Sequence, residues 1–148
     1  MADMLYNPFF FAQLGGDATH PPIDFNTDAI KIALVTSSYT PVKTDAFWST
    51  PDGFEVSSSG YSAGGATLAN VTVTQDDTNN WGKFTADPVT WTAVTLTARG
   101  AVIYKYNADP TLAQLVKYFD FGTDKTATGV DFTITFNAGG ILTLGATA

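Results

Sequence analysis

Apolar and polar residues alternate along much of this chain, and the alternation predicts β-strands. In residues 29–35, Ile30, Ile32 and Leu34 fall on one face of an extended segment and Lys31 falls on the other. A period of two is typical of a half-buried strand, with one face on the core and one in water. We expect further strands, several with threonine outward, at residues 71–74, 81–86, 89–99, 101–106, 112–121, 132–136 and 141–144.

Turn-forming residues separate these segments. Residues 76–80, Asp-Asp-Thr-Asn-Asn, predict a hairpin, and residues 107–110 and 137–140 are further turns. The polar residues 122–129 are interpreted as a loop. In residues 89–93 we expect Val89, Trp91 and Ala93 to face inward. Seven or eight strands at intervals of roughly 8–15 residues predict an all-β fold, an antiparallel β-sandwich or a barrel.

The N-terminal segment predicts an arm with a short helix. Asn7 is suited to the N-cap, Pro8 to the first helical position, and the glycine pair at residues 15–16 to the stop. Three consecutive phenylalanines, residues 9–11, cannot all face one core from a single turn. Either two of them pack inward and one is half covered, or the arm docks on a neighbouring subunit. Prolines make residues 20–22 an extended connector, so we divide the chain into an arm, residues 1–22, and one sandwich domain, residues 23–145.

Residues 37–65 are the least regular part of the chain. They are rich in proline, glycine and serine but also carry large apolar side chains. A flexible linker would not carry these, so we expect a long ordered loop with one short helical turn or strand, of the kind that often forms binding surfaces. Together with the arm it supplies the candidate partner-binding residues Phe9, Phe10, Phe11, Phe47, Trp48, Phe54 and Tyr61.

Composition and charge restrict the partners. A chain of 148 residues, 45% of them hydrophobic, is the size of one domain with one core. The net charge is −7, and the seven lysines and arginines occur singly, which argues against nucleic acid and against an anionic membrane. The N-terminus lacks the pattern of a secretory signal, and no apolar run approaches the roughly 20 residues that span a bilayer.

The residues offer little for catalysis. There is no cysteine, and His20 and Glu55 are the only residues of their types. That leaves no second imidazole for a metal site and no glutamate pair, so we expect no enzyme activity, no cofactor and no metal. Two groups were weighed as calcium ligands, but neither has the spacing of a calcium loop: Asp76, Asp77 and Asn79, and Asp120, Asp124 and Asp131.

Four segments in their order along the chain resemble a family of small virion structural proteins of tailed bacteriophages and prophages. The first two are IDFNTDAIKIALVT at residues 23–36 and GYSAGGATL at residues 60–68. The third joins VTW at residues 89–91 to TARGAVIYK at residues 97–105, and the fourth is DFTITFN at residues 131–137. The resemblance spans residues 7–144 and brings no catalytic residues with it.

The resemblance implies a virion component made in the cytoplasm of a bacterial host. Small β-rich proteins that clamp a shell need no chemistry, so we expect a capsid decoration, or cement, protein that binds the major capsid protein on the capsid surface. Copies of the chain would also contact one another, for example as a trimer. By analogy with other capsid-attached proteins the sandwich is expected to be jelly-roll-like. The alternatives are a tail or fibre component, and a glycan- or receptor-binding module that uses residues 37–65.

Overall fold

A computed structural model describes residues 2–145 of the chain, and it confirms the expected all-β fold with two antiparallel sheets and one short helix. The described helical elements are α1 (Asn7–Gln13) and the 3-10 turn η1 (Asp52–Phe54). The described strands are β1 (Met4–Leu5), β2 (Ile30–Val35), β3 (Ala66–Thr67), β4 (Thr72–Asp76), β5 (Trp81–Thr85), β6 (Val89–Lys105), β7 (Leu115–Ile134) and β8 (Leu142–Gly145).

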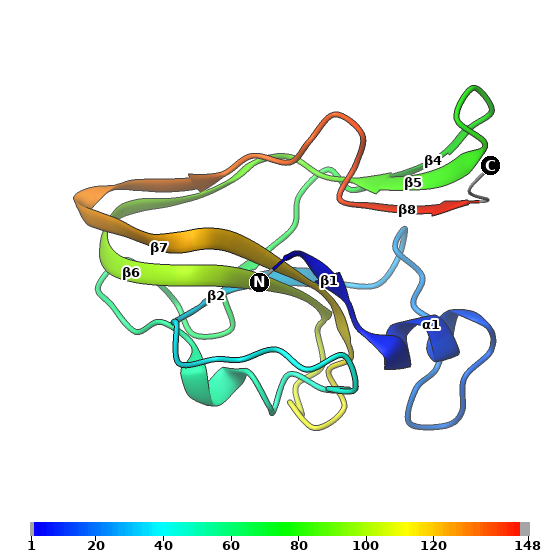
Figure 1. The fold of residues 1–148 in the computed structure, drawn as a ribbon, viewed down its shortest axis with the longest axis horizontal. Helices are drawn as coiled ribbons and strands as arrows, with labels where there is room; N and C mark the ends of the chain where they lie inside the picture. Colours follow the sequence, from blue (N-terminus) through cyan, green and yellow to red (C-terminus); the bar gives the residue numbers. More distant parts are fainter. Residues whose placement is uncertain (1, 146–148) are drawn as a thin grey trace.

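The strands form a large sheet with the order β1-β7-β6-β2-β3 and a small sheet with the order β4-β5-β8. Figure 1 shows the small sheet above the large one, with α1 beside them. The expected antiparallel β-sandwich is confirmed, with five strands in one described sheet and three in the other.

The long hairpin of β6 and β7 joins the two layers. Both strands bend on the left of Figure 1, where the pairing register shifts repeatedly, for example between Trp91 and Val94. Bulges of this kind sharpen twist and turn a sheet corner. At the bulge Ala93 has φ +52° and is exposed, so Val94 faces inward instead of Ala93. The segment 122–129, expected to be a loop, continues β7, and that strand begins at Leu115 rather than at residue 112.

The main core lies between the two sheets and beneath α1. Strand β2 contributes Ile30, Ile32 and Leu34, and the small sheet contributes Phe84 and Leu142. The other face of β2 is also covered, because Ala33 and Val35 belong to a second buried cluster. The expectation of a half-buried strand was therefore wrong here: β2 is a central strand with a layer on each side.

Residues 36–55 form that second layer. Tyr39 and Trp48 from this segment pack with Val35, Tyr104 and Tyr118 on the face of the large sheet that points away from the small one. Glu55 bridges to Val35, and Phe47 bridges to Gln114, so the segment is tied to the sheet at two points. The expected ordered loop with one helical turn is thus present, and it covers the sheet.

The N-terminal segment is joined to the large sheet. Strand β1 pairs with β7, and Tyr6 is fully buried. Helix α1 begins at Asn7 with Tyr6 as the capping residue, one position earlier than the sequence suggested. The backbone N–H of Asn7 donates to the carbonyl of Lys43 at 2.7 Å, which ties the start of the helix to the long loop, and no side chain caps this helix end.

Candidate functional site

Helix α1 places the three consecutive phenylalanines on different sides. Phe9 is 1% exposed and packs in the main core, whereas Phe10 and Phe11 are 42% and 48% exposed. Successive residues of a helix are about 100° apart, which explains why one of the three faces inward. The structure therefore corrects the expectation that two pack inward.

Leu14 extends the exposed face of the helix. It is 91% exposed and follows Phe10 by four positions and Phe11 by three. Residues at these spacings lie on the same face of a helix. Phe10, Phe11 and Leu14 therefore present one continuous group of large apolar side chains to solvent.

Phe47 of the long loop joins this group, because His20 lies in contact with both Phe47 and Phe11. The His20 ring stacks on Phe47 with centroids 4.9 Å apart, and it meets Phe11 edge-on at 6.0 Å. The candidates Phe11 and Phe47, 36 positions apart in sequence, are thereby brought together. We refer to Phe10, Phe11, Leu14, His20 and Phe47 as the aromatic surface.

Hydrogen bonds fix His20 within this surface. Its Nδ1 lies 3.0 Å from Oδ1 of Asp17 and 2.9 Å from Oγ1 of Thr19. The same Asp17 oxygen accepts from the backbone N–H of His20 at 2.8 Å. Hydrogen bonds from Thr19 first, and then from His20, lower the pKa of Asp17 to about 2. Asp17 is therefore ionised near neutral pH and orients the imidazole against Phe47.

The backbone beneath the aromatic surface is also held. The side chain of Gln13 accepts from the N–H of Ile23 at 2.8 Å and donates to its carbonyl at 3.2 Å. Gln114 is buried and donates through Nε2 to the carbonyl of Pro21 at 3.0 Å. The connector after α1 is thus clamped to the helix and to the large sheet, so the surface is preformed.

The remaining candidate residues lie elsewhere. Trp48 and Tyr61 are buried in different core clusters, and neither ring face is open to solvent. Phe54 is 40% exposed and lies near Tyr39, with ring centroids 5.8 Å apart. Of the seven candidates, the structure therefore brings Phe10, Phe11 and Phe47 into one surface.

Tyr61 and Glu55 form a partly buried polar contact. The Tyr61 hydroxyl donates to Oε1 of Glu55 at 2.6 Å and accepts from the backbone N–H of Leu34 at 2.9 Å. The N–H of Gly64 also donates to Glu55, at 2.8 Å. Burial raises the pKa of Glu55 above 4.5, and these hydrogen bonds oppose that shift. The contact ties residues 55–64 to β2.

The acidic residues considered as calcium ligands make hydrogen bonds and ion pairs within the protein. Asp76 accepts hydrogen bonds from Thr78 and Asn79 within its own turn, and Asp131 accepts from the N–H of Ala93 at the bulge. Asp120 pairs with Arg99 at 3.1 Å. No group of three metal-ligating side chains was found among residues 2–145.

Sequence reasoning missed Leu14 and His20 as members of the aromatic surface. The spacing of Leu14 from Phe10 and Phe11 was a usable signal, because a helix over these residues was expected. His20 carried no such signal, since its contact with Phe47 depends on the tertiary course of the loop.

Nothing matches this chain among protein-family models, curated proteins or solved structures.

Proposed function

We propose that this protein is a non-catalytic structural component of a bacteriophage virion, and specifically a capsid decoration protein that binds the major capsid protein. The observation that carries the proposal is the aromatic surface. Phe10, Phe11 and Leu14 are exposed together on a helix whose opposite face is locked into the core. Large apolar groups that are contiguous and exposed are typical of protein interaction sites.

The energetics suit a protein that is used in many copies. Fully burying a large apolar side chain contributes roughly 1.5–3 kcal/mol, so the half-exposed Phe10 and Phe11 would contribute about 1 kcal/mol each. Because the surface is preformed, little ordering entropy opposes docking. Weak individual contacts gain strength when neighbouring copies bind a repeating shell and also touch one another.

Charge and sequence favour the same kind of partner. The net charge of −7 suits a shell with a basic outer face, since complementary charge speeds and orients association. The resemblance of residues 7–144 to small virion proteins supplies the setting, which physical chemistry alone does not. In this setting the protein is made in the cytoplasm of the host and acts on the capsid surface.

The alternatives differ in how the structure bears on them. A tail or fibre component would use the same aromatic surface but at few copies per particle. A glycan-binding module would need open aromatic ring faces in residues 37–65, whereas Trp48 and Tyr61 of this segment are buried. We therefore keep the tail component as the second candidate.

Quantitative mass spectrometry of purified virions tests the location. A decoration protein is expected at a number of copies comparable with that of the major capsid protein. A handful of copies per particle would instead support the tail or fibre component and refute the decoration role.

A surface variant tests the mode of binding. Exchanging Phe10 and Phe11 together for serine should leave the β fold intact, because neither is buried, and should reduce binding to capsids that lack this protein. Val130→Ser is the matched control, since Val130 is 55% exposed on the distant β6–β7 hairpin. Equal capsid binding by the double variant and the control, measured by co-sedimentation, would refute docking through the aromatic surface.

A further inference from the structure

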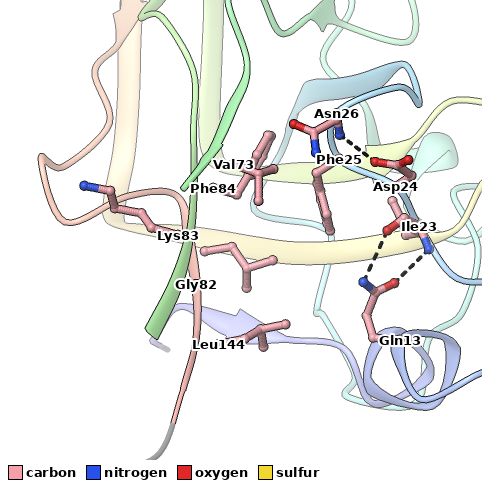
Figure 2. A pocket seen from close by; sticks show the side chains of 11 residues that line it. Gln13, Ile23, Asp24, Phe25, Asn26, Val73, Gly82, Lys83, Phe84 and Leu144 are labelled. Carbon is pink, nitrogen blue, oxygen red and sulfur yellow. Dashed lines mark hydrogen bonds between the residues drawn. The ribbon is translucent and has the colours of Figure 1, made fainter. Parts of the chain in front are cut away.

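A second apolar feature lies between the small sheet and the connector that follows α1. It is a cleft of about 350 Å³. One wall is the inner face of the small sheet, with Val73, Gly82 and Leu144, and the other is formed by residues 23–26 with Gln13 (Figure 2). Phe25 and Phe84 meet at its base with ring centroids 4.6 Å apart.

The register of the small sheet explains why the cleft is apolar. Val73, Phe84 and Leu142 lie directly opposite one another across the three strands. The next row on the same face holds Gln75, Gly82 and Leu144. Lys83 belongs to the opposite face, and Figure 2 shows its amine directed away from the connector.

Gly82 leaves the wall of the cleft open. A Cβ atom built on Gly82 would meet only the carbonyl oxygen of Leu144, at 3.9 Å, so a side chain fits there without a clash. Val73 and Leu144, on either side, are each 45% exposed. The sheet thus exposes apolar surface where a larger residue in place of Gly82 would have covered it.

The far wall is rigid. Gln13 clamps the backbone of Ile23 by the two hydrogen bonds described above, both drawn in Figure 2. Asp24 holds the next turn, because its Oδ1 accepts from the N–H of Asn26 at 2.9 Å and its own N–H donates to Asp28. The cleft is therefore preformed.

Strand β4 leaves an unpaired edge beside this cleft. It is the outer strand of the small sheet, and Thr72–Gln75 are exposed. No backbone hydrogen bond joins its outer edge to another residue within 2–145. The strand has no lysine, proline or register shift, which are the features that usually protect an edge from strand addition.

Acidic groups flank both ends of β4. Asp76 and Asp77 follow it, and Asp87 is hydrogen-bonded to Asn70 just before it. An added strand of positive charge would meet carboxylates at each end. A second copy is disfavoured, because antiparallel pairing of two β4 edges would place the acidic ends of one copy against those of the other.

We propose that β4 and the cleft accept an extended segment of a basic partner, which adds to the small sheet as a fourth strand. Its alternate side chains are apolar and pack beside Val73, and long ones reach over β4 into the space that Gly82 leaves open on β5. Its flanking residues are lysine or arginine. Strand addition of this kind takes affinity from main-chain hydrogen bonds and specificity from pockets for alternate side chains. The proposal uses different residues from the aromatic surface and does not rest on the virion assignment.

The test uses the full chain and a synthetic peptide, KKLTLTLKK, with blocked ends. We expect saturable binding by calorimetry, with amide shift changes in NMR spectra centred on β4. The counterpart with glutamate in place of lysine should bind at least about tenfold more weakly. A peptide methylated at alternate backbone nitrogens should also lose binding, because it cannot form the strand ladder.

Gly82→Val separates the cleft from the rest of the surface. The valine fills the wall and favours the strand, so the variant should fold at least as well as the parent and bind the peptide about tenfold more weakly. Thr74→Val, on the opposite face of β4, is the control and should bind normally. Val73→Lys, which places a cation at the exposed mouth, should also weaken binding.

Two results would overturn the proposal. One is that the lysine-flanked peptide fails to saturate the parent protein or binds Gly82→Val equally well. The other is that the parent forms a dimer that Gly82→Val abolishes, without binding the peptide, which would identify a second copy as the occupant.

Discussion

The indole of Trp48 lies flat against the ring of Tyr104, with centroids 4.5 Å apart and planes 5° from parallel. The contact joins the long loop to the central strand β6. The backbone N–H of Trp48 donates to the carbonyl of Ala113, and the Tyr104 hydroxyl donates to the carbonyl of Gly64. Residues 37–65, the irregular part of the sequence, are therefore held on the large sheet at both Trp48 and Gly64. The Trp48 side chain thus has a structural role.

Trp48→Ala tests this role. Removing a buried indole that stacks on Tyr104 leaves a cavity, and we expect the free energy of unfolding to fall by about 3–5 kcal/mol. Phe54→Ala in the same loop is the control, because the half-exposed Phe54 should cost less than about 1 kcal/mol. Urea denaturation of the two variants measures the difference. Equal losses would contradict a structural role for the Trp48 stack.

The split of the three phenylalanines gives a second prediction. Phe9→Ala removes a fully buried ring and should lower the free energy of unfolding by about 3–5 kcal/mol. Phe10→Ala and Phe11→Ala each remove a ring that is already half in water, so each should cost about 1 kcal/mol or less. Thermal denaturation of the three variants gives the order. A loss at Phe10 as large as that at Phe9 would show that α1 is rotated from the position described.

A third prediction concerns the approach of the long loop to β2. Gly65 has φ +72°, and a Cβ atom there would overlap the carbonyl oxygen of Ile32 and lie 2.6 Å from the Cα of Ala33. Gly65→Ala should therefore lower the free energy of unfolding by about 3 kcal/mol or more, because both the backbone angle and the contact are unfavourable. Gly53→Ala, with no atom within 4 Å of its Cβ, should be nearly neutral. Chemical denaturation that showed no difference between the two would contradict this close approach.

The partly buried carboxyl of Glu55 gives a prediction on pH. Burial raises its pKa above 4.5, so the folded protein holds this proton more tightly than the unfolded chain. The stability contributed by the protonated form is present below the unfolded pKa and is lost as the pH rises through the folded pKa. In Glu55→Gln the side chain keeps an acceptor for Tyr61 but does not ionise.

We therefore expect the free energy of unfolding of Glu55→Gln, minus that of the parent, to become more positive as the pH rises from about 4 towards neutrality. Urea titrations at several pH values measure this difference. A difference that stays constant with pH would show that ionisation of Glu55 does not oppose folding.

Local patterns predicted most of the strands. The alternation at residues 71–74 and 81–86, with the turn between them, predicted the β4–β5 hairpin, and residues 141–144 predicted β8. These predictions succeeded because apolar and polar residues alternate in each segment and turn residues lie between them. The prediction of a loop at residues 122–129 was wrong, because glycine and polar residues at a bulged sheet corner have the composition of a loop. The prediction that Ala93 faces inward was wrong, because a bulge adds one residue to the strand and the residues after it point to the opposite face.

For the candidate site, too, local patterns could not predict contacts between distant residues. Two of the three phenylalanines were expected to pack inward, yet the helical period points only Phe9 at the core and leaves Phe10 and Phe11 exposed. Trp48 and Phe47 are neighbours in one loop, and nothing local indicates that one is buried on Tyr104 while the other meets His20. Those contacts join residues that are distant along the chain.

By itself the sequence determined an all-β protein with a short N-terminal helix, because strand periodicity, turn residues and caps act over a few positions. Only the tertiary structure decided the strand order, the burial of Trp48 and Tyr61, and the meeting of Phe11 with Phe47. It also opened the cleft beside Gly82. These features depend on which distant segments share a layer, and that choice is made by the packing of the whole chain into two sheets and a covering loop.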